Sequence, residues 1–158
     1  TPSFRGRRIE AGLLSAGQDF TNNTNPFSVG LGRFVDLEKE NFIGKKALVN
    51  ADKNCRSWGI RVVDGIAKKG KTLKIDGNLI GSVTSSTWSP FQVCGVGIVF
   101  MDRADVGPGT IVDVECTDEK FHKGEICKLP MYDPKGEIVR GINKNIPSKP
   151  EPWPGIKG

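Results

Sequence analysis

The sequence predicts a mainly β protein with minor α content, organised around six short strands. Six runs of β-type residues are separated by turn-forming residues, and the 158-residue chain contains 20 glycines and 10 prolines. One segment alone has the pattern of a helix. Short strands with regular turn signals are typical of a small barrel or sandwich that closes on itself.

The predicted strands begin after residue 56. They cover residues 57–63, 72–75, 79–86, 93–101, 110–116 and 120–129. The strongest turn signal is Asp76-Gly77, because glycine adopts a positive φ at little cost and the flanking segments are apolar and β-branched. We therefore expect a hairpin at this position.

The first 52 residues have a different character. Residues 1–35 are rich in glycine and asparagine, which predicts short elements without a core of their own. Residues 36–52 form the helix candidate: Asn41 is expected to cap a turn that opens at Phe42, with Ile43 and Ala47 on the apolar side. Gly44 should keep this helix short.

The C-terminal segment after Pro130 has five further prolines and little apolar periodicity. Such a sequence buries too little apolar surface to offset the entropy of ordering it. The last 20 residues or so are therefore expected to form a tail that is mobile or wraps over the domain or a partner.

Composition excludes several classes of function. No apolar run approaches the roughly 20 residues of a membrane-spanning helix, so no membrane partner is expected. The net charge of +5 is modest and suits an anionic ligand or an acidic partner. The four cysteines form no Cys-x-x-Cys pair and His122 is the single histidine, so we predict no metal site, reduced thiols and a cytoplasmic location.

Six short motifs follow one another along the chain. They are Arg8-Ile9-Glu10-Ala11-Gly12, Gly17-Gln18-Asp19, Asn25-Pro26-Phe27, Phe42-Ile43-Gly44-Lys45-Lys46-Ala47-Leu48, Gly81-Ser82-Val83-Thr84-Ser85 and Leu129-Pro130. In content and order these motifs resemble those of one known family, the glycine cleavage T-proteins or aminomethyltransferases. Ala16 and Arg33 depart from the pattern, at positions where family members often have aromatic residues. Asn25-Pro26-Phe27 is more similar to the dimethylsulfoniopropionate demethylases of the same superfamily.

The resemblance implies an architecture and a function. Residues 1–52 would be the closing fragment of an α+β, folate-binding middle lobe, and residues 53–133 a six-stranded Greek-key β-barrel. Residues 134–158 are the proline-rich tail, which composition alone predicts. The chain would be the C-terminal fragment of a tetrahydrofolate-dependent aminomethyltransferase or methyltransferase, inactive alone. Its implied partners are the missing N-terminal portion or a second copy, and a small-molecule one-carbon donor.

The resemblance also implies which residues contact the cofactor tetrahydrofolate. Arg8 is the first candidate and Arg5 the second, because a guanidinium pairs with the glutamate carboxylates of folate in a bidentate fork. Glu10 is the third candidate. The alternative is that Arg8 bonds Glu10, Asp19 or backbone carbonyls and fixes the loop. No catalytic residue is predicted in this chain.

Two other functions remain open from the residues. The barrel can be a stand-alone binding or docking module without transfer chemistry. A nucleic-acid-binding barrel is disfavoured, because it needs exposed aromatic side chains beside basic groups and only 8% of the residues are aromatic. If the chain is part of a larger ring of domains, an apolar contact face should be exposed, and residues 1–35 should be poorly ordered, swapped or packed on a partner.

Overall fold

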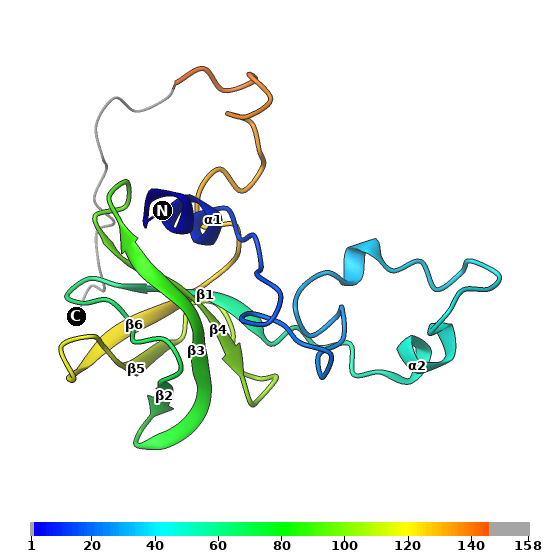
Figure 1. Ribbon diagram of the computed structural model, residues 1–158, viewed down its shortest axis with the longest axis horizontal. Coiled ribbons are helices and arrows are strands. Elements are labelled where there is room, and N and C mark those ends of the chain that lie inside the picture. Colours follow the sequence, from blue (N-terminus) through cyan, green and yellow to red (C-terminus); the bar gives the residue numbers. More distant parts are fainter. Residues whose placement is uncertain (1, 146–158) are drawn as a thin grey trace.

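The computed structural model describes residues 2–145, which form three helical elements and six strands (Figure 1). The helical elements are α1 (Pro2–Glu10), the 3₁₀ turn η1 (Gly32–Phe34) and α2 (Lys45–Asn50). The strands are β1 (Ser57–Val62), β2 (Thr72–Ile75), β3 (Asn78–Ser89), β4 (Cys94–Met101), β5 (Ile111–Glu115) and β6 (Phe121–Cys127). The predicted strands are thus confirmed, with small shifts at their ends.

The six strands form a closed antiparallel barrel in the order β1-β4-β3-β2-β5-β6. Strands β2, β3 and β4 follow one another as a meander, whereas β1 lies beside β4 and also pairs with β6, which closes the barrel (Figure 1). Three consecutive strands in a meander, with the strand that precedes them in the sequence placed beside the last of the three, form a Greek key. The predicted mainly β fold class is confirmed.

The hairpin between β2 and β3 has the predicted two-residue turn. Ile75 faces Asn78 across the ladder, and Asp76 and Gly77 have φ values of 48° and 80°. Two consecutive residues of positive φ give the turn the twist that matches the flanking strands. This explains why an Asp-Gly pair was an informative signal.

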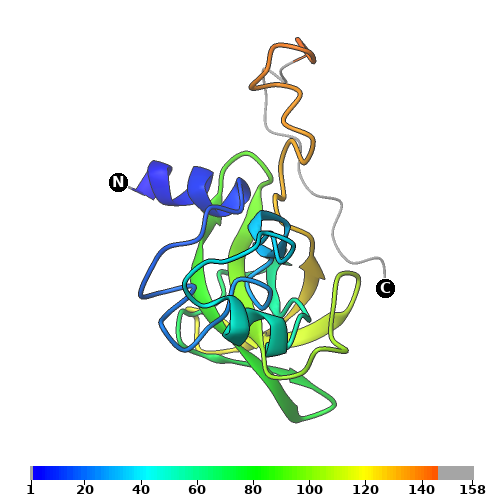
Figure 2. The same ribbon diagram turned by 90° about the vertical axis from the view of Figure 1, so that its right-hand side faces the viewer.

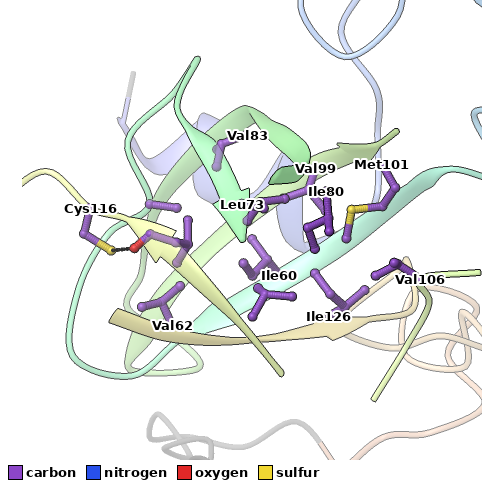
Figure 3. Packing of buried hydrophobic residues seen from close by; sticks show 13 residues of the cluster. Ile60, Val62, Leu73, Ile80, Val83, Val99, Met101, Val106, Cys116 and Ile126 are labelled. Carbon is purple, nitrogen blue, oxygen red and sulfur yellow. Dashed lines mark hydrogen bonds between the residues drawn. The ribbon is translucent and has the colours of Figure 1, made fainter. Parts of the chain in front are cut away.

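Apolar side chains from all six strands fill the barrel (Figure 3). They include Ile60, Leu73, Ile80, Val99 and Ile126, each at most 1% exposed. Strand β4 is buried on both of its faces, because Val96 and Ile98 belong to a second apolar cluster outside the barrel. The barrel wall therefore separates an inner core from an outer one.

Helix α1 covers the outer core. Its Ile9 is fully buried against the outer cluster, which also contains Cys94, Cys127 and Met131. Gly6 faces β3, and a Cβ at this position would lie 3.6 Å from the carbonyl oxygen of Trp88. Residues 1–35 were expected to form only short elements and no helix was predicted here, whereas the structure has a nine-residue helix that packs on β3 and β4.

Residues 21–56 form a lobe that projects from the side of the barrel (Figures 1 and 2). The predicted helix start was wrong: α2 begins at Lys45 instead of Phe42, and Asn41 caps nothing. The reason is Gly44, whose φ of 89° is incompatible with a right-handed helix. The predicted apolar side is also not buried, because α2 has no buried residue and Ile43 is fully exposed.

Residues 134–145 contain no helix or strand. Turns in this segment are held by the Asp133 carboxylate, whose oxygens accept hydrogen bonds from the backbone N–H groups of Glu137 (2.8 Å) and Ile138 (3.0 Å). The predicted tail falls largely on residues 146–158, which lie outside the described residues.

Candidate functional site

The residues that the sequence singled out lie where α1 and the following loop meet the outer face of the barrel. Arg8, near the end of α1, donates to the Asp19 carboxylate (2.8 Å), to the carbonyl oxygen of Leu13 (2.6 Å) and to the Ser85 hydroxyl (2.9 Å). Its side chain is only 13% exposed. Arg8 therefore joins α1, the loop of residues 11–20 and β3.

Asp19 is the central acceptor of this junction. Its side chain is fully buried and also accepts hydrogen bonds from the backbone N–H of Ser15 (2.8 Å) and the hydroxyl of Thr84 (2.7 Å). Burial acts to raise the pKa of Asp19, but hydrogen bonds from Ser85, Thr84, Ser15 and Arg8 outweigh it and hold the pKa below the usual 3.8. Asp19 is therefore ionised at neutral pH and balances the charge of Arg8.

Glu10 lies in a separate buried network. It is 7% exposed, and its carboxylate accepts a short hydrogen bond from the hydroxyl of Ser89. The Ser89 oxygen in turn accepts from the backbone N–H of Gln92 (2.9 Å), and the side-chain carbonyl of Gln92 accepts from Arg61 (2.7 Å). This network ties the end of α1 to the loop between β3 and β4 and to β1.

Residues that follow the last strand of the barrel also bond to members of this network. The carbonyl oxygen of Glu10 accepts a hydrogen bond from the backbone N–H of Met131 (2.7 Å), and Arg61 donates to the carbonyl oxygen of Met131 (3.1 Å). Phe91 and Tyr132 pack edge to face, with ring centroids 4.5 Å apart. Residues 131–132 thus hold α1 against the barrel.

The three predicted cofactor residues therefore have different environments. Arg5 is exposed and makes no hydrogen bond or ion pair with the rest of the described chain, so its guanidinium is available to a ligand carboxylate. Arg8 has three of its five N–H groups bonded within the chain, as the structural alternative anticipated, and keeps Nε–H and one Nη2–H. Glu10 faces Ser89 and not solvent.

Sequence reasoning missed the barrel residues that complete both networks. Thr84 and Ser85 belong to a family motif but were given no role. No role was predicted for Ser89, Gln92 or Arg61 either. Their contacts with α1 and its loop span up to 79 positions in the sequence. The motif Gly81-Ser82-Val83-Thr84-Ser85 was the one available signal, because hydroxyl side chains in a strand suggest polar contacts on one face.

The cysteines are poorly suited to nucleophilic or metal chemistry. All four are unpaired, and burial raises the pKa of Cys94, Cys116 and Cys127 to about 11. Within residues 2–145, no group of three or more His, Cys, Asp or Glu side chains is arranged to hold a metal ion.

A shallow depression of about 300 Å³ lies between the β2–β3 hairpin and the loop after β4. It contains Arg103 and Asp105, which pair with each other, beside the apolar side chains of Ile75, Ile80 and Val106. Because its charged groups already satisfy one another, it is a weaker candidate for an anionic ligand than the surface around Arg5.

Comparison with known proteins places the barrel in a family. Residues 56–133 match the glycine cleavage T-protein C-terminal barrel domain. The chain is 35% identical over 130 residues to an aminomethyltransferase of Prochlorococcus marinus, covering 79% of this chain and 35% of the relative. It is 38% identical over 116 residues to the dimethylsulfoniopropionate demethylase DmdA of Ruegeria pomeroyi, covering 70% of this chain and 32% of the relative.

A solved structure gives the same result. The glycine cleavage system aminomethyltransferase T from Bartonella henselae matches with a TM-score of 0.69 and 29% identity, over 80% of this chain and 37% of that one. The chain spans about a third of the length of the relatives that it matches. No helix among the described residues is long and apolar enough to cross a membrane. With its closed barrel and these matches, the chain belongs to the glycine cleavage T-protein superfamily and corresponds to the C-terminal portion of its members.

Proposed function

We propose that this chain supplies the C-terminal barrel and part of the folate pocket wall of a tetrahydrofolate-dependent aminomethyltransferase or methyltransferase. The observation that carries the proposal is the match of residues 56–133 to the family's C-terminal barrel domain within a chain that spans a third of its relatives. A third of such a protein is too little to enclose a cofactor, so the chain alone is inactive in this proposal.

Tetrahydrofolate would supply the acceptor nitrogen for a one-carbon unit. In this proposal Arg5 binds a carboxylate of the folate glutamate, since its guanidinium is exposed and has no partner in the described chain. Arg8 can offer Nε–H and one Nη2–H to the same group, while its other donors hold the loop through Asp19. Glu10, the last residue of α1, is buried, and its role is to position that helix on the barrel.

The proposal names the acceptor of the one-carbon unit and not its donor. Relatives of similar identity include aminomethyltransferases and a dimethylsulfoniopropionate demethylase. The four unpaired cysteines support a reducing compartment such as the cytoplasm.

Calorimetric titration with tetrahydrofolate tests this function. The chain is titrated alone and as a fusion in which the N-terminal two-thirds of the Prochlorococcus marinus aminomethyltransferase precede it. We expect heat of binding from the fusion only. Arg5→Gln in the fusion should raise Kd about tenfold, which is about 1.4 kcal/mol, because a charge-assisted pair is lost. A fusion that folds cooperatively but binds no tetrahydrofolate would overturn the proposal.

Arg7→Gln is the matched control, since Arg7 is on the same helix, is exposed and has no side-chain partner in the described chain. Its Kd should equal that of the unmodified fusion. If the fusion binds and both variants bind equally well, the pocket does not use Arg5.

The second candidate function is a docking module without transfer chemistry. It is favoured by the three hydrogen bonds that Arg8 makes within the chain and by the burial of Glu10, contacts that suit structural roles for both residues. The absence of tetrahydrofolate binding by a folded fusion would support this alternative.

A further inference from the structure

The depression between the β2–β3 hairpin and the loop after β4 has an apolar floor. Ile80 and Val106 are at most 5% exposed and belong to the inner core, and Ile75 packs against that core. Figure 3 shows Val106 at one end of the row of core side chains. The floor is therefore an apolar surface that borders the inner core and opens to solvent.

Backbone hydrogen bonds fix the walls of the depression. The N–H of Asp102 donates to the carbonyl oxygen of Ile80 (2.9 Å), which holds the loop after β4 against β3. Thr110 is held by β6, because its carbonyl oxygen accepts a hydrogen bond from the N–H of Ile126 (2.9 Å). A volume of about 300 Å³ between fixed walls is at the lower end of the range of small-molecule sites.

The rim of the depression is acidic, in contrast to the chain as a whole. Residues 75–80 and 102–106 contain three aspartates and one arginine, a net charge of −2, whereas the whole chain has a net charge of +5. Arg103 is neutralised, because its Nε–H donates to one oxygen of the Asp105 carboxylate (2.9 Å) and its Nη2–H to the other. The carboxylate of Asp76 makes no hydrogen bond or ion pair within residues 2–145. A negative charge without a counter-charge therefore stands beside an apolar floor.

We propose that this depression binds a small aliphatic ammonium ion. The alkyl chain lies on the apolar floor, and the ammonium group pairs with the carboxylate of Asp76 at the rim. Thr110 lines the same depression, and its hydroxyl oxygen can accept a hydrogen bond from the ammonium group. An anion of the same size is disfavoured, because the guanidinium of Arg103 is already paired.

This site is separate from the proposed folate pocket wall. The β2–β3 hairpin lies at the opposite end of the barrel from α1 (Figure 1). Arg5 and Arg8, the residues proposed to bind folate, are both on α1. Binding of an ammonium ion therefore requires neither tetrahydrofolate nor an upstream portion, and it is measured on this chain alone. Failure of one proposal leaves the other intact.

Titration of the ¹⁵N-labelled chain with hexylammonium chloride, followed by NMR, tests the site. We expect saturable shifts in the backbone amide signals within residues 75–80 and 103–110. Methylammonium has the same charge without the alkyl chain, and burial of even two methylene groups is worth about tenfold in affinity. Its Kd should therefore be at least about tenfold higher. Hexanoate has an alkyl chain of similar length and the opposite charge, and it should give no saturable shifts.

Asp76→Asn isolates the contribution of the charge. Asparagine is well tolerated at the first position of this hairpin turn, where φ is positive, so the turn is retained. The Kd of hexylammonium should rise about threefold, a typical loss for an exposed pair. Asp64→Asn is the matched control, since Asp64 is exposed, lacks a side-chain partner in the described chain and changes the net charge equally. Its Kd should equal that of the unmodified chain.

Several results would overturn the proposal. Shifts that increase linearly without saturation would mean contact at high concentration only. Hexanoate binding as tightly as hexylammonium would mean that the negative charge is not used, and methylammonium binding as tightly would mean that the apolar floor is not used. An unchanged Kd in Asp76→Asn, or equal weakening by both variants, would show that Asp76 is not the counter-charge.

Discussion

Asp19 and Arg8 form the one described ion pair in which neither side chain is more than 13% exposed. Asp19→Asn keeps the size of the side chain but removes its charge, which leaves Arg8 largely buried without a counter-charge. Breaking such a pair costs about 3 kcal/mol. We expect the free energy of unfolding, measured by urea titration, to fall by about this amount.

Asp105→Asn is the comparison for this variant, because Asp105 pairs with Arg103 at an exposed position. Its free energy of unfolding should change little, since exposed pairs contribute little. Equal stability of the Asp19→Asn variant and the unmodified chain would show that the ion pair between Arg8 and Asp19 contributes nothing to the free energy of unfolding.

Lowering the pH should remove the contribution of Asp19 to the free energy of unfolding. The pKa of Asp19 is lower in the folded chain than the usual 3.8, because its hydrogen bonds outweigh its burial. Between the folded and unfolded pKa values the unfolded chain binds more protons, so the contribution of Asp19 is present above about pH 4 and is lost as the pH falls below it.

The expected result is a stability difference between the unmodified chain and Asp19→Asn that is constant at pH 5 to 7 and shrinks below about pH 4. Urea titrations of both proteins at several pH values measure it. Taking the difference removes the contributions of Asp52, Asp105 and Asp118, whose pKa values are also lowered, mainly by hydrogen bonds. A difference that grows on acidification would contradict this assignment.

Helix α1 includes a glycine that its packing does not require. A Cβ on Gly6 would lie 3.6 Å from its nearest neighbour, which is ordinary van der Waals contact, and alanine is the better helix former. Gly6→Ala should therefore stabilise the protein by about 0.5–1 kcal/mol. Thermal unfolding should show a raised Tm.

Gly12→Ala, just after α1, should lower Tm, in contrast to Gly6→Ala. Gly12 has a φ of 68°, and a Cβ there would lie 3.0 Å from the Cβ of Leu129. Both the backbone conformation and the contact disfavour alanine, so Tm should fall. Destabilisation by Gly6→Ala would mean that α1 packs more closely on β3 than its geometry indicates.

The barrel is stabilised as one cooperative unit by its inner core. Strand β1 closes the barrel, because it pairs with both β4 and β6. Its residue Ile60 is fully buried in the inner core. Ile60→Ala should reduce the free energy of unfolding by about 3 kcal/mol through lost burial and a cavity. Val49→Ala in the exposed lobe should change it by less than about 0.5 kcal/mol, and urea titration distinguishes the two.

Across the whole molecule, sequence reasoning predicted what depends on local pattern. The strands and the Asp76-Gly77 hairpin follow from alternation and turn chemistry, which act over a few residues. Helix α1 was missed because Gly6 and the glycines that follow it lower helix propensity, whereas burial of Ile9 on the barrel stabilises the helix. The start of α2 was wrong because the conformation of Gly44 interrupts the apolar pattern.

The candidate site was predictable only in part. The pairing of Arg8 with Asp19 was foreseen as an alternative, since the two are 11 positions apart in one segment. The contact of Arg8 with Ser85 spans 77 positions, and the burial of Glu10 depends on Ser89 at a similar separation. Such contacts depend on how the barrel closes, which no local pattern encodes.

The hydrogen bond between Met131 N–H and the carbonyl oxygen of Glu10 brings together the two ends of the folded unit. Any polypeptide joined before α1 and any that follows residue 133 leave the barrel from the same side. The β2–β3 hairpin lies at the opposite end of the barrel from α1 (Figure 1). The unit can therefore be circularly permuted with a linker from residue 133 to the start of α1 and a new start in this hairpin, or inserted as a cassette into a loop of another protein.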